Sequence, residues 1–317
     1  FLEQVVASDP NFARGWTLLG QSLNMLMTGR VVRGEVSRDA AEVIEARARA
    51  EAYANMAIAL APDHAESYVI LANMNMAEGK WQDAMDDLRQ ALARDPYAPE
   101  ILNNYRNLLR ALGYLKEALE VSERLNLVEP LLLIYQRLRA EVVAANGMTD
   151  KGVTEYLRAG GGTRVGDLQF LMPAYAQLGR FTDAVEAMSE GGNRLRLTSG
   201  PFAEPLVEAA TEVLRAAANK SEPPSPLPDF EGALSAVYLY TNTPERMLEF
   251  MERDVKYGPT RSGYGFLRAM WWPMPSSLRK TEWFKALVRD AGLVDYWRAR
   301  GWPDLCRPVG SDDFACE

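Results

Sequence analysis

The sequence predicts an all-α solenoid in which helical hairpins stack on one another. The main evidence is a pair of ladders, in which prolines and glycines each recur every 34 residues. The positions are Pro62, Pro96 and Pro130 for one ladder and Gly79, Gly113 and Gly147 for the other. Alanines recur at the same distance, in the pairs Ala57 and Ala91, and Ala84 and Ala118. Separate ladders with one period indicate copies of one supersecondary unit.

The unit from residue 65 to residue 96 shows how particular residues end the two helices of the repeat and let them pack. Its first helix ends at Gly79, because glycine accepts the left-handed backbone conformation that follows a helix. Its second helix carries Ala84 and Ala91 on one face, where small side chains let two helix axes approach. Pro96 stops this helix. Each hairpin leaves an apolar face open, so the next hairpin must cover it.

This unit resembles the tetratricopeptide repeat, with Tyr68, Leu71-Ala72, Gly79 and the later alanines and proline at the family offsets. The next unit, from residue 99 to residue 130, is similar but departs from the pattern at Ser122 and Leu125. The resemblance covers roughly residues 1–190. It implies a superhelix whose concave groove, lined by the first helix of each hairpin, binds a peptide or protein partner.

The first unit is interrupted. Trp16, Leu19 and Gly20 stand at repeat offsets, but the closing proline is Pro62, 18 residues later than the period requires. We therefore predict an insertion around residues 28–48, formed by an exposed loop and a second helix lengthened to about Asp39–Leu60.

The period weakens after Gly147. One further unit has Tyr175, Gly179 and Ala184 at repeat offsets, and a Pro-rich break at residues 219–229 interrupts the helical pattern beyond it. We expect a repeat array at 1–190, an irregular helical continuation at 191–265, and C-terminal capping helices with a tail at 266–317.

The last fifty residues are rich in aromatic side chains. We predict a helical cap over the last open repeat face, and the alternative is a ligand pocket among Trp271, Trp272 and Tyr296. The stretch LRKTEWFKALVRDAGLVDYWRARGWPDLCRP, at 278–308, resembles the tail of bacterial tetratricopeptide proteins fused to adenylate/guanylate cyclase or winged-helix DNA-binding domains. The resemblance implies the C-terminal sensor or interaction region of such a regulator. The opening stretch FLEQVVASDPN reads as half of a helix, so we expect a fragment of a larger protein.

Both cysteines of the chain, Cys306 and Cys316, lie near its end. A bridge between them closes a short loop and is worth about 2.5–3 kcal/mol by chain entropy. Such a bridge persists in an oxidising compartment. We therefore expect a periplasmic or otherwise extracytoplasmic location, and the alternative is a pair of free thiols in the cytoplasm.

No catalytic, metal-binding or cofactor-binding pattern stands out. The one histidine, His64, is expected as an exposed turn residue, and the Gly-rich stretch AGGGTRVG lacks the Lys-Ser/Thr of a phosphate loop. A net charge of -8 disfavours nucleic acid as a partner. No apolar run is long enough to predict a membrane span in this segment.

Candidate binding residues lie at the groove offsets of the first helices. They are Gln21, Asn24, Asn73, Asn103, Asn107, Arg110 and Arg137. Amides suit an extended peptide backbone, and the two arginines suit a carboxylate in forked geometry. This set partly resembles the carboxylate clamp of peptide-binding members of the family, but the clamp lysine is not evident. The alternative is a solvated groove wall.

The sequence thus predicts a non-catalytic scaffold that binds a protein or peptide. The alternatives are a small-molecule-sensing domain and a helical accessory domain of an enzyme whose catalytic part lies elsewhere. Nothing in the sequence indicates an oligomeric state.

Overall fold

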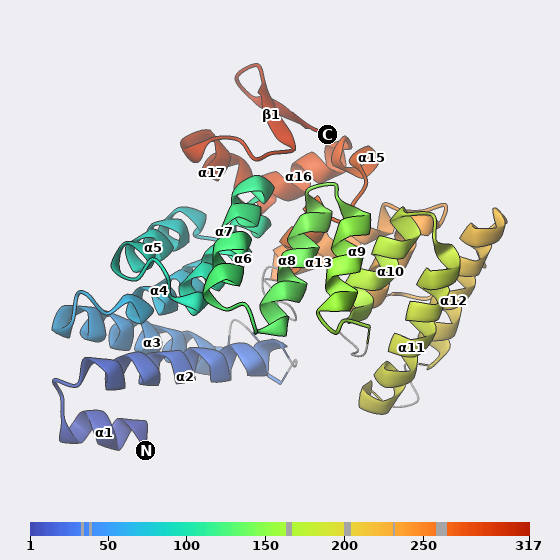
Figure 1. Cartoon of the computed structure of the whole chain (residues 1–317). Helices are drawn as coiled ribbons and strands as arrows, with labels where there is room; N and C mark the ends of the chain where they lie inside the picture. The colour runs from blue at the N-terminus through green and yellow to red at the C-terminus, as the bar shows by residue number, and fades with distance from the viewer. Residues whose placement is uncertain (33–34, 38–39, 163–166, 200–203, 231, 258–264) are drawn as a thin grey trace. The chain divides into compact units, whose positions relative to one another are not determined.

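The computed structural model describes residues 1–32, 35–37, 40–162, 167–199, 204–230, 232–257 and 265–317. Antiparallel helical hairpins follow one another along this part of the chain (Figure 1). The first residues form α1 (Leu2–Ser8). The hairpins are α2–α3 (Ala13–Val32, Ala41–Leu60), α4–α5 (Ala65–Ala77, Trp81–Arg94), α6–α7 (Pro99–Leu112, Leu115–Val128), α8–α9 (Leu133–Ala145, Thr149–Arg158) and α10–α11 (Leu168–Gln177, Phe181–Ser199).

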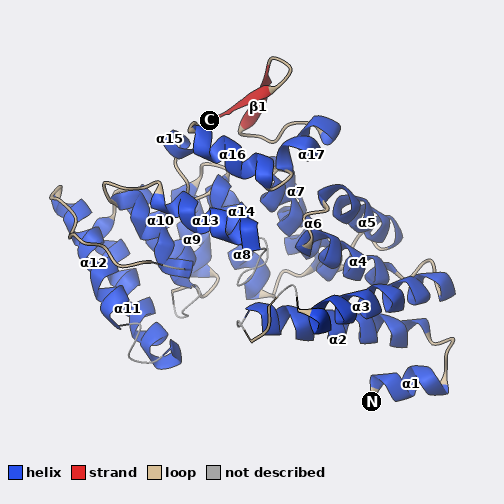
Figure 2. Ribbon diagram, turned by 180° about the vertical axis from the view of Figure 1, so that it is seen from behind, coloured by secondary structure: helices blue, strands red, loops and turns tan. Residues whose placement is uncertain are grey.

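The remaining elements are shorter and less regular. They are α12 (Glu204–Asn219), the 3₁₀ helix η3 (Gly232–Tyr240), α13 (Arg246–Tyr257), α14 (Gly265–Trp271), α15 (Ser276–Arg279), α16 (Glu282–Asp290), α17 (Leu293–Arg300), and strands β1 (Cys306–Val309) and β2 (Asp313–Cys316). Helices dominate the ribbon, and β1 and β2 are the strands of the described part (Figure 2). The fold is all-α and built from stacked helical hairpins, as predicted.

The chain forms two compact units that are interleaved in the sequence. The first unit contains residues 1–128, 253–268 and 288–303, and the second contains residues 129–252, 269–287 and 304–317. The expected blocks at 1–190, 191–265 and 266–317 are consecutive in the sequence, because local patterns do not reveal which distant segments pack together. Each unit is described by itself below.

The glycine ladder has the expected backbone conformation. Gly113 has a φ of 89°. Its N–H donates to the carbonyl oxygen of Arg110, and the next N–H, of Tyr114, donates to that of Leu109. This pair of bonds is the Schellman motif, which satisfies carbonyl groups at the end of a helix. Gly79, Gly147 and Gly179 repeat both the positive φ and the bond pattern.

The proline ladder has a second role that the period alone did not reveal. The side chain six positions after the proline donates to the carbonyl oxygen of that proline in three hairpins. The pairs are Trp16 to Pro10 at 2.9 Å, Tyr68 to Pro62 at 3.2 Å, and Gln136 to Pro130 at 2.5 Å. These bonds tie three of the loops to the helix that follows each of them. In the α6–α7 hairpin the corresponding position is Leu102, which has no donor, and Arg124 of α7 donates to the Pro96 carbonyl oxygen instead, at 2.9 Å.

Small residues pack the helices closely, as the alanine ladder predicts. Ala57, Ala84, Ala91 and Ala118 are fully buried. In the first hairpin a β-carbon at Gly20 would lie 3.1 Å from the carbonyl oxygen of Ala50, so the two backbones nearly touch there. Ala50 and Ala54 join Ile70 and Met74 in one apolar cluster between α3 and α4.

The insertion lengthens both helices of the first hairpin. The second helix, α3, runs from Ala41 to Leu60 as predicted, but α2 also continues to Val32. The predicted loop is correspondingly shorter. Residues 33–34 and 38–39 of this loop lie outside the described residues.

In the second unit, α12 packs on α11 and η3 packs on α10 and α12. Tyr240 of η3 donates its hydroxyl to the carbonyl oxygen of Pro173 at 3.4 Å, and its ring meets that of Phe181 edge to face. The face of the last recognised hairpin is therefore covered by α12 and η3, which follow it in the sequence.

The aromatic tail is helical, but its contacts differ from the expected cap over the last repeat. In the first unit it packs on the turns inside two hairpins. Trp81 donates to the carbonyl oxygen of Ala291 at 2.7 Å, and Tyr114 donates to that of Gly301 at 2.6 Å. In the second unit Gln177, the last residue of α10, accepts from the indole of Trp272 at 2.9 Å.

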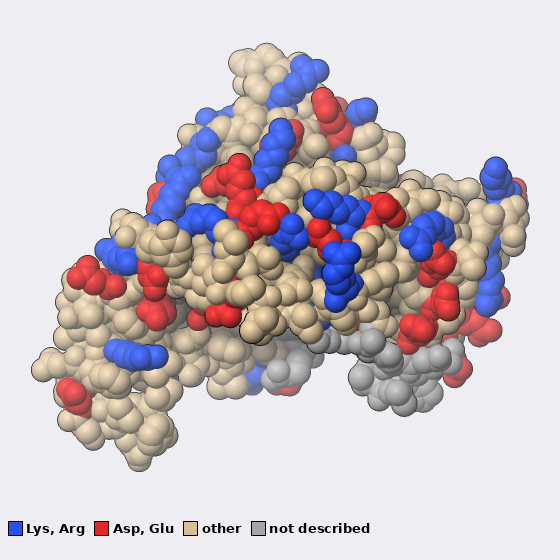
Figure 3. Space-filling view, viewed as in Figure 1, with Lys and Arg blue, Asp and Glu red and all other residues tan. Residues whose placement is uncertain are grey.

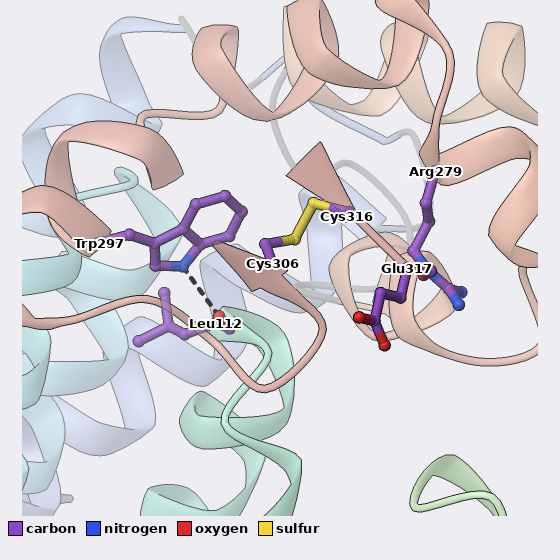
Figure 4. The surroundings of a disulfide bond; sticks show 6 residues. All are labelled: Leu112, Arg279, Trp297, Cys306, Cys316 and Glu317. Carbon is purple, nitrogen blue, oxygen red and sulfur yellow. Dashed lines mark hydrogen bonds between the residues drawn. A yellow bond between two sulfur atoms is a disulfide. The ribbon is translucent and has the colours of Figure 1, made fainter. Parts of the chain in front are cut away.

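Strands β1 and β2 pair as an antiparallel hairpin in which Cys306 lies opposite Cys316. The two cysteines are joined by a disulfide (Figure 4). Arg279 of α15, a buried residue, donates to main-chain oxygens of Glu317 and Met274. Lys285 of α16 reaches Asp313 at 2.8 Å. The hairpin is thus fastened to α15 and α16 of the second unit, a contact that the sequence did not predict.

Candidate functional site

The predicted binding residues fall in both units. Six of them lie on the first helices of hairpins in the first unit, and Arg137 lies on α8 in the second unit. Those in the first unit are Gln21 and Asn24 on α2, Asn73 on α4, and Asn103, Asn107 and Arg110 on α6.

The two asparagines of α6 form one arrangement around a residue that sequence reasoning missed. Arg106 is fully buried, and one of its nitrogens donates to the side-chain oxygens of Asn103 at 2.5 Å and Asn107 at 3.1 Å. Both asparagines remain partly exposed. Because Arg106 occupies their carbonyl oxygens, the amide NH₂ groups are the parts left to donate to a ligand.

The two predicted arginines are buried rather than exposed. Arg110 is 5% exposed and Arg137 is 3% exposed. Arg137 donates to the carbonyl oxygen of Ala159 at 2.8 Å, so its guanidinium closes the turn after α9. The prediction from groove offsets requires that one face of each first helix be open to solvent, whereas α6 is buried on most sides. An exposed forked clamp for a carboxylate is therefore not formed by these side chains.

The residues of α2 contact other parts of the first unit. Gln21 donates to Glu100 of α6 at 3.4 Å. Asn24 lines a crevice of about 40 Å³ whose other walls are mostly apolar. These walls are Leu23, Met27, Thr28, Val31, Val43, Ala46, Arg47 and Ala77. Asn73 of α4 is partly exposed.

His64 is not the exposed turn residue that its position suggested. Its side chain is 21% exposed, and Nδ1 lies 3.1 Å from the hydroxyl oxygens of both Thr17 and Ser67. Nε2 lies 3.3 Å from Glu66. Ser, His and Glu are present together, but the Ser67 side chain is fully buried and cannot meet a substrate. The cluster joins α2 to the start of α4. The position of His64 in the turn after Pro62 did not indicate its contact with Thr17 of α2.

The aromatic residues weighed as a ligand pocket pack against protein. In the second unit Trp271 meets Phe284 edge to face and Trp272 lies over Phe170 at 5.1 Å. In the first unit Tyr296 meets Tyr114 edge to face. Each of these rings thus packs against another aromatic side chain of the protein.

One carboxyl group of the first unit has a strongly shifted pKa. Burial raises the pKa of Asp87 on α5 to about 6, although Asn75 donates to this carboxylate at 2.8 Å. The hydrogen bond favours the charged form and offsets part of the desolvation cost. Asp87 therefore takes up a proton at a higher pH than an ordinary aspartate does.

Over the described ranges, no three His, Cys, Asp or Glu side chains come together as metal ligands. The same residues include no helix long and apolar enough to cross a membrane.

No family model matches this chain, and no curated protein matches it. Among solved structures it is similar to YrrB, described as a tetratricopeptide protein with an unusual peptide-binding site, at 13% identity and a TM-score of 0.44 over 65% of this chain and 97% of YrrB. It is also similar to PilF of Pseudomonas aeruginosa, at 15% identity and a TM-score of 0.48 over 76% of this chain and 99% of PilF. A third similar structure is Naa15/Naa10 bound to HypK, at 17% identity and a TM-score of 0.35 over 89% of this chain and 43% of the other.

Proposed function

We propose that this chain is a non-catalytic scaffold that binds a protein or peptide on the first helices of its first unit. The observation that carries the proposal is a set of partly exposed amides on successive first helices. They are Gln21 on α2, Asn73 on α4, and Asn103 and Asn107 on α6. Amides spaced along parallel helices can bond the backbone of an extended segment, whatever its sequence.

The buried arginines refine the expected ligand. Because Arg110 and Arg137 are engaged inside the fold, recognition relies on neutral donors rather than on a charged clamp. The Arg106 contacts hold the oxygens of Asn103 and Asn107 and leave NH₂ donors for carbonyl oxygens of the ligand. An internal peptide segment fits this chemistry better than a free C-terminal carboxylate.

The test is a selection of peptides from a random library displayed on phage against the intact chain, followed by calorimetric titration of the selected peptides. Asn73→Ala and Asn107→Ala should each weaken binding about five- to tenfold. Asn104→Ala is the matched control, because Asn104 also lies on α6 but donates to the Glu100 carbonyl oxygen of its own helix. Selected peptides that bind both variants as tightly as the parent chain would refute the proposal.

We also propose that the chain is the interaction or sensor region of a larger bacterial signalling or transcription regulator. The similarity of residues 278–308 to the tails of such proteins supports this reading. The test is to read the gene upstream of the codon for Phe1. An output domain encoded there would support the proposal, because a regulator of this kind carries such a domain upstream of the repeats.

The bonded cysteines support an extracytoplasmic location. Alkylation of the protein in intact cells before lysis, followed by mass spectrometry without reduction, tests it. Two alkylated thiols would contradict this location.

A further inference from the structure

The second unit carries a run of large apolar side chains that face solvent. Leu131, just before α8, is 89% exposed, and Leu132, Leu133 and Ile134 are between 41% and 48% exposed. Consecutive exposed residues of this kind are uncommon on the surface of a soluble domain and mark sites of contact. Leu133 and Ile134 begin α8 and Leu132 is its N-cap residue, so the start of the helix fixes the positions of these three side chains.

The apolar surface continues onto the neighbouring helix. α8 and α9 are antiparallel partners, so the start of α8 lies beside the end of α9. Leu133 lies 3.9 Å from the β-carbon position of Gly160, in the turn after α9. The β-carbon position of Gly162 lies 3.6 Å from Leu157 of α9 and 3.8 Å from Leu171 of α10. Leu157 is itself exposed, so exposed apolar side chains lie on both α8 and α9, whereas Leu171 of α10 is buried below them.

Beyond Leu157 this surface opens into a hollow of about 170 Å³ between α9, α10 and α11. Its apolar floor is formed by Leu157, Leu168, Leu171 and the ring of Tyr175. Liquid water takes about 30 Å³ per molecule, so the hollow can accept one long side chain. The hollow belongs to the second unit, whereas the first-helix surface proposed above belongs to the first unit.

The wall of the hollow on α11 is acidic. Asp183, Glu186 and Glu190 follow one another at helical spacing and all line it. Figure 3 shows Asp and Glu side chains grouped over α11 and α12. Arg180, a basic group of the lining, pairs with Asp183 at 2.5 Å and lies over the ring of Tyr175. Glu186 and Glu190 are exposed and retain their charge for an incoming cation.

The floor of the hollow is fixed before any partner arrives. Asp167 is 4% exposed and accepts from the hydroxyl of Tyr156 and the N–H of Gly162, each at 2.8 Å. Burial raises the pKa of the Tyr175 hydroxyl, the nearby Arg180 guanidinium lowers it, and the carboxylates of Asp183, Glu186 and Glu190 raise it. The hollow thus has a negative potential above an apolar base.

We propose that this surface, formed by residues 131–134, Leu157 and the acidic hollow beside α11, docks a basic amphipathic helix of a partner protein. Apolar side chains of the helix cover the leucines, and one lysine or arginine enters the hollow toward Glu186 and Glu190. This is helix-in-groove recognition with charge complementarity. An anionic membrane is disfavoured by the acidic wall. A second copy in a symmetric dimer is disfavoured too, because it would bring the same acidic wall toward this one.

The test uses a fluorescein-labelled 18-residue helical peptide with leucines on one face and lysines on the other, titrated into the intact chain by anisotropy. Leu131→Ser/Leu132→Ser and Glu186→Gln/Glu190→Gln should each raise its Kd about tenfold, and the second change should also flatten the salt dependence. A peptide with glutamates in place of the lysines should not bind. Glu208→Gln/Glu212→Gln on α12 is the matched control, since it removes the same charge from exposed positions of the same unit.

Equal weakening by the α12 control would show non-specific attraction and overturn the proposal, as would an unchanged Kd in both test variants. Sedimentation that shows a dimer lost on Leu131→Ser/Leu132→Ser would assign the surface to a second copy. Vesicles of phosphatidylcholine and phosphatidylglycerol that bind the chain, but not this variant, would assign it to a membrane. Asn107→Ala should leave the Kd of this peptide unchanged, which separates this result from the first-helix proposal.

Discussion

Trp297 donates its indole N–H to the main-chain carbonyl oxygen of Leu112 at 3.0 Å, across 185 positions of the sequence (Figure 4). Leu112 is the last residue of α6 and directly precedes the Gly113 turn. The Trp297 ring is fully buried, and Trp302 lies beside it. Trp297, in the last segment of the first unit, thus donates a hydrogen bond to a carbonyl group at the end of α6 that has no N–H partner within that helix.

Trp297→Ala should therefore destabilise the first unit strongly. Loss of a buried tryptophan costs about 3–5 kcal/mol, and an unpaired carbonyl group adds to this cost. Denaturant unfolding followed by circular dichroism measures the loss. Trp283→Ala is the control, because Trp283 is only partly buried, and it should cost much less. Equal losses would mean that the Leu112 contact contributes nothing.

Gly147→Ala should isolate the strain of the repeat turn. Gly147 has a φ of 83°, and nothing lies within 4 Å of its β-carbon position, so the substitution adds no clash. The left-handed conformation costs an alanine about 1–2 kcal/mol. Gly147→Asn should cost less, because asparagine tolerates this region. Thermal unfolding of both variants measures the difference, and a loss for asparagine as large as for alanine would argue against backbone strain.

Reduction of the disulfide should loosen the C-terminal hairpin. Opening this short loop costs about 2.5–3 kcal/mol if β1 and β2 unfold freely afterwards. Hydrogen exchange of residues 304–317 should accelerate in reducing agent, while that of α4 and α5 should not change. Cys306→Ser/Cys316→Ser should reproduce the effect without reductant. Unchanged exchange in this variant would mean that Arg279 and Lys285 alone hold the hairpin.

Asp87→Asn should stabilise the first unit in a pH-dependent way. The folded-state pKa of Asp87, about 6, lies above its ordinary value of 3.8, so ionisation disfavours the folded state. The parent chain therefore loses stability as pH rises from about 4 through 6, and the variant avoids this loss. Melting temperatures should differ at pH 7.5 and converge near pH 3.5. Asp63→Asn is the control for the same substitution at an exposed position. A constant difference between Asp87→Asn and the parent chain at all pH values would contradict the assignment.

Local sequence signals predicted the hairpins well, because they report on local physics. Gly113 needs a left-handed turn and Ala118 needs close packing, and both requirements recur at fixed offsets. The same offsets failed for Arg110 and Arg137, because the burial of a helix face depends on segments far away in the sequence. The Trp297–Leu112 bond and the Arg279 contacts were not predictable for the same reason. Leu131 to Ile134 were visible in the sequence, but their exposure was not.

The interleaved units have a consequence for synthesis of the protein. The first unit contains residues 1–128 together with residues 253–268 and 288–303, so its set of contacts is complete only when residue 303 has left the ribosome. At about 5–20 residues per second, the early hairpins wait on the order of ten seconds with apolar surface uncovered. During that delay Trp81 and the Leu112 carbonyl group lack their partners in the C-terminal segment. The nascent chain then depends on chaperones, or on rapid completion of synthesis, to avoid aggregation.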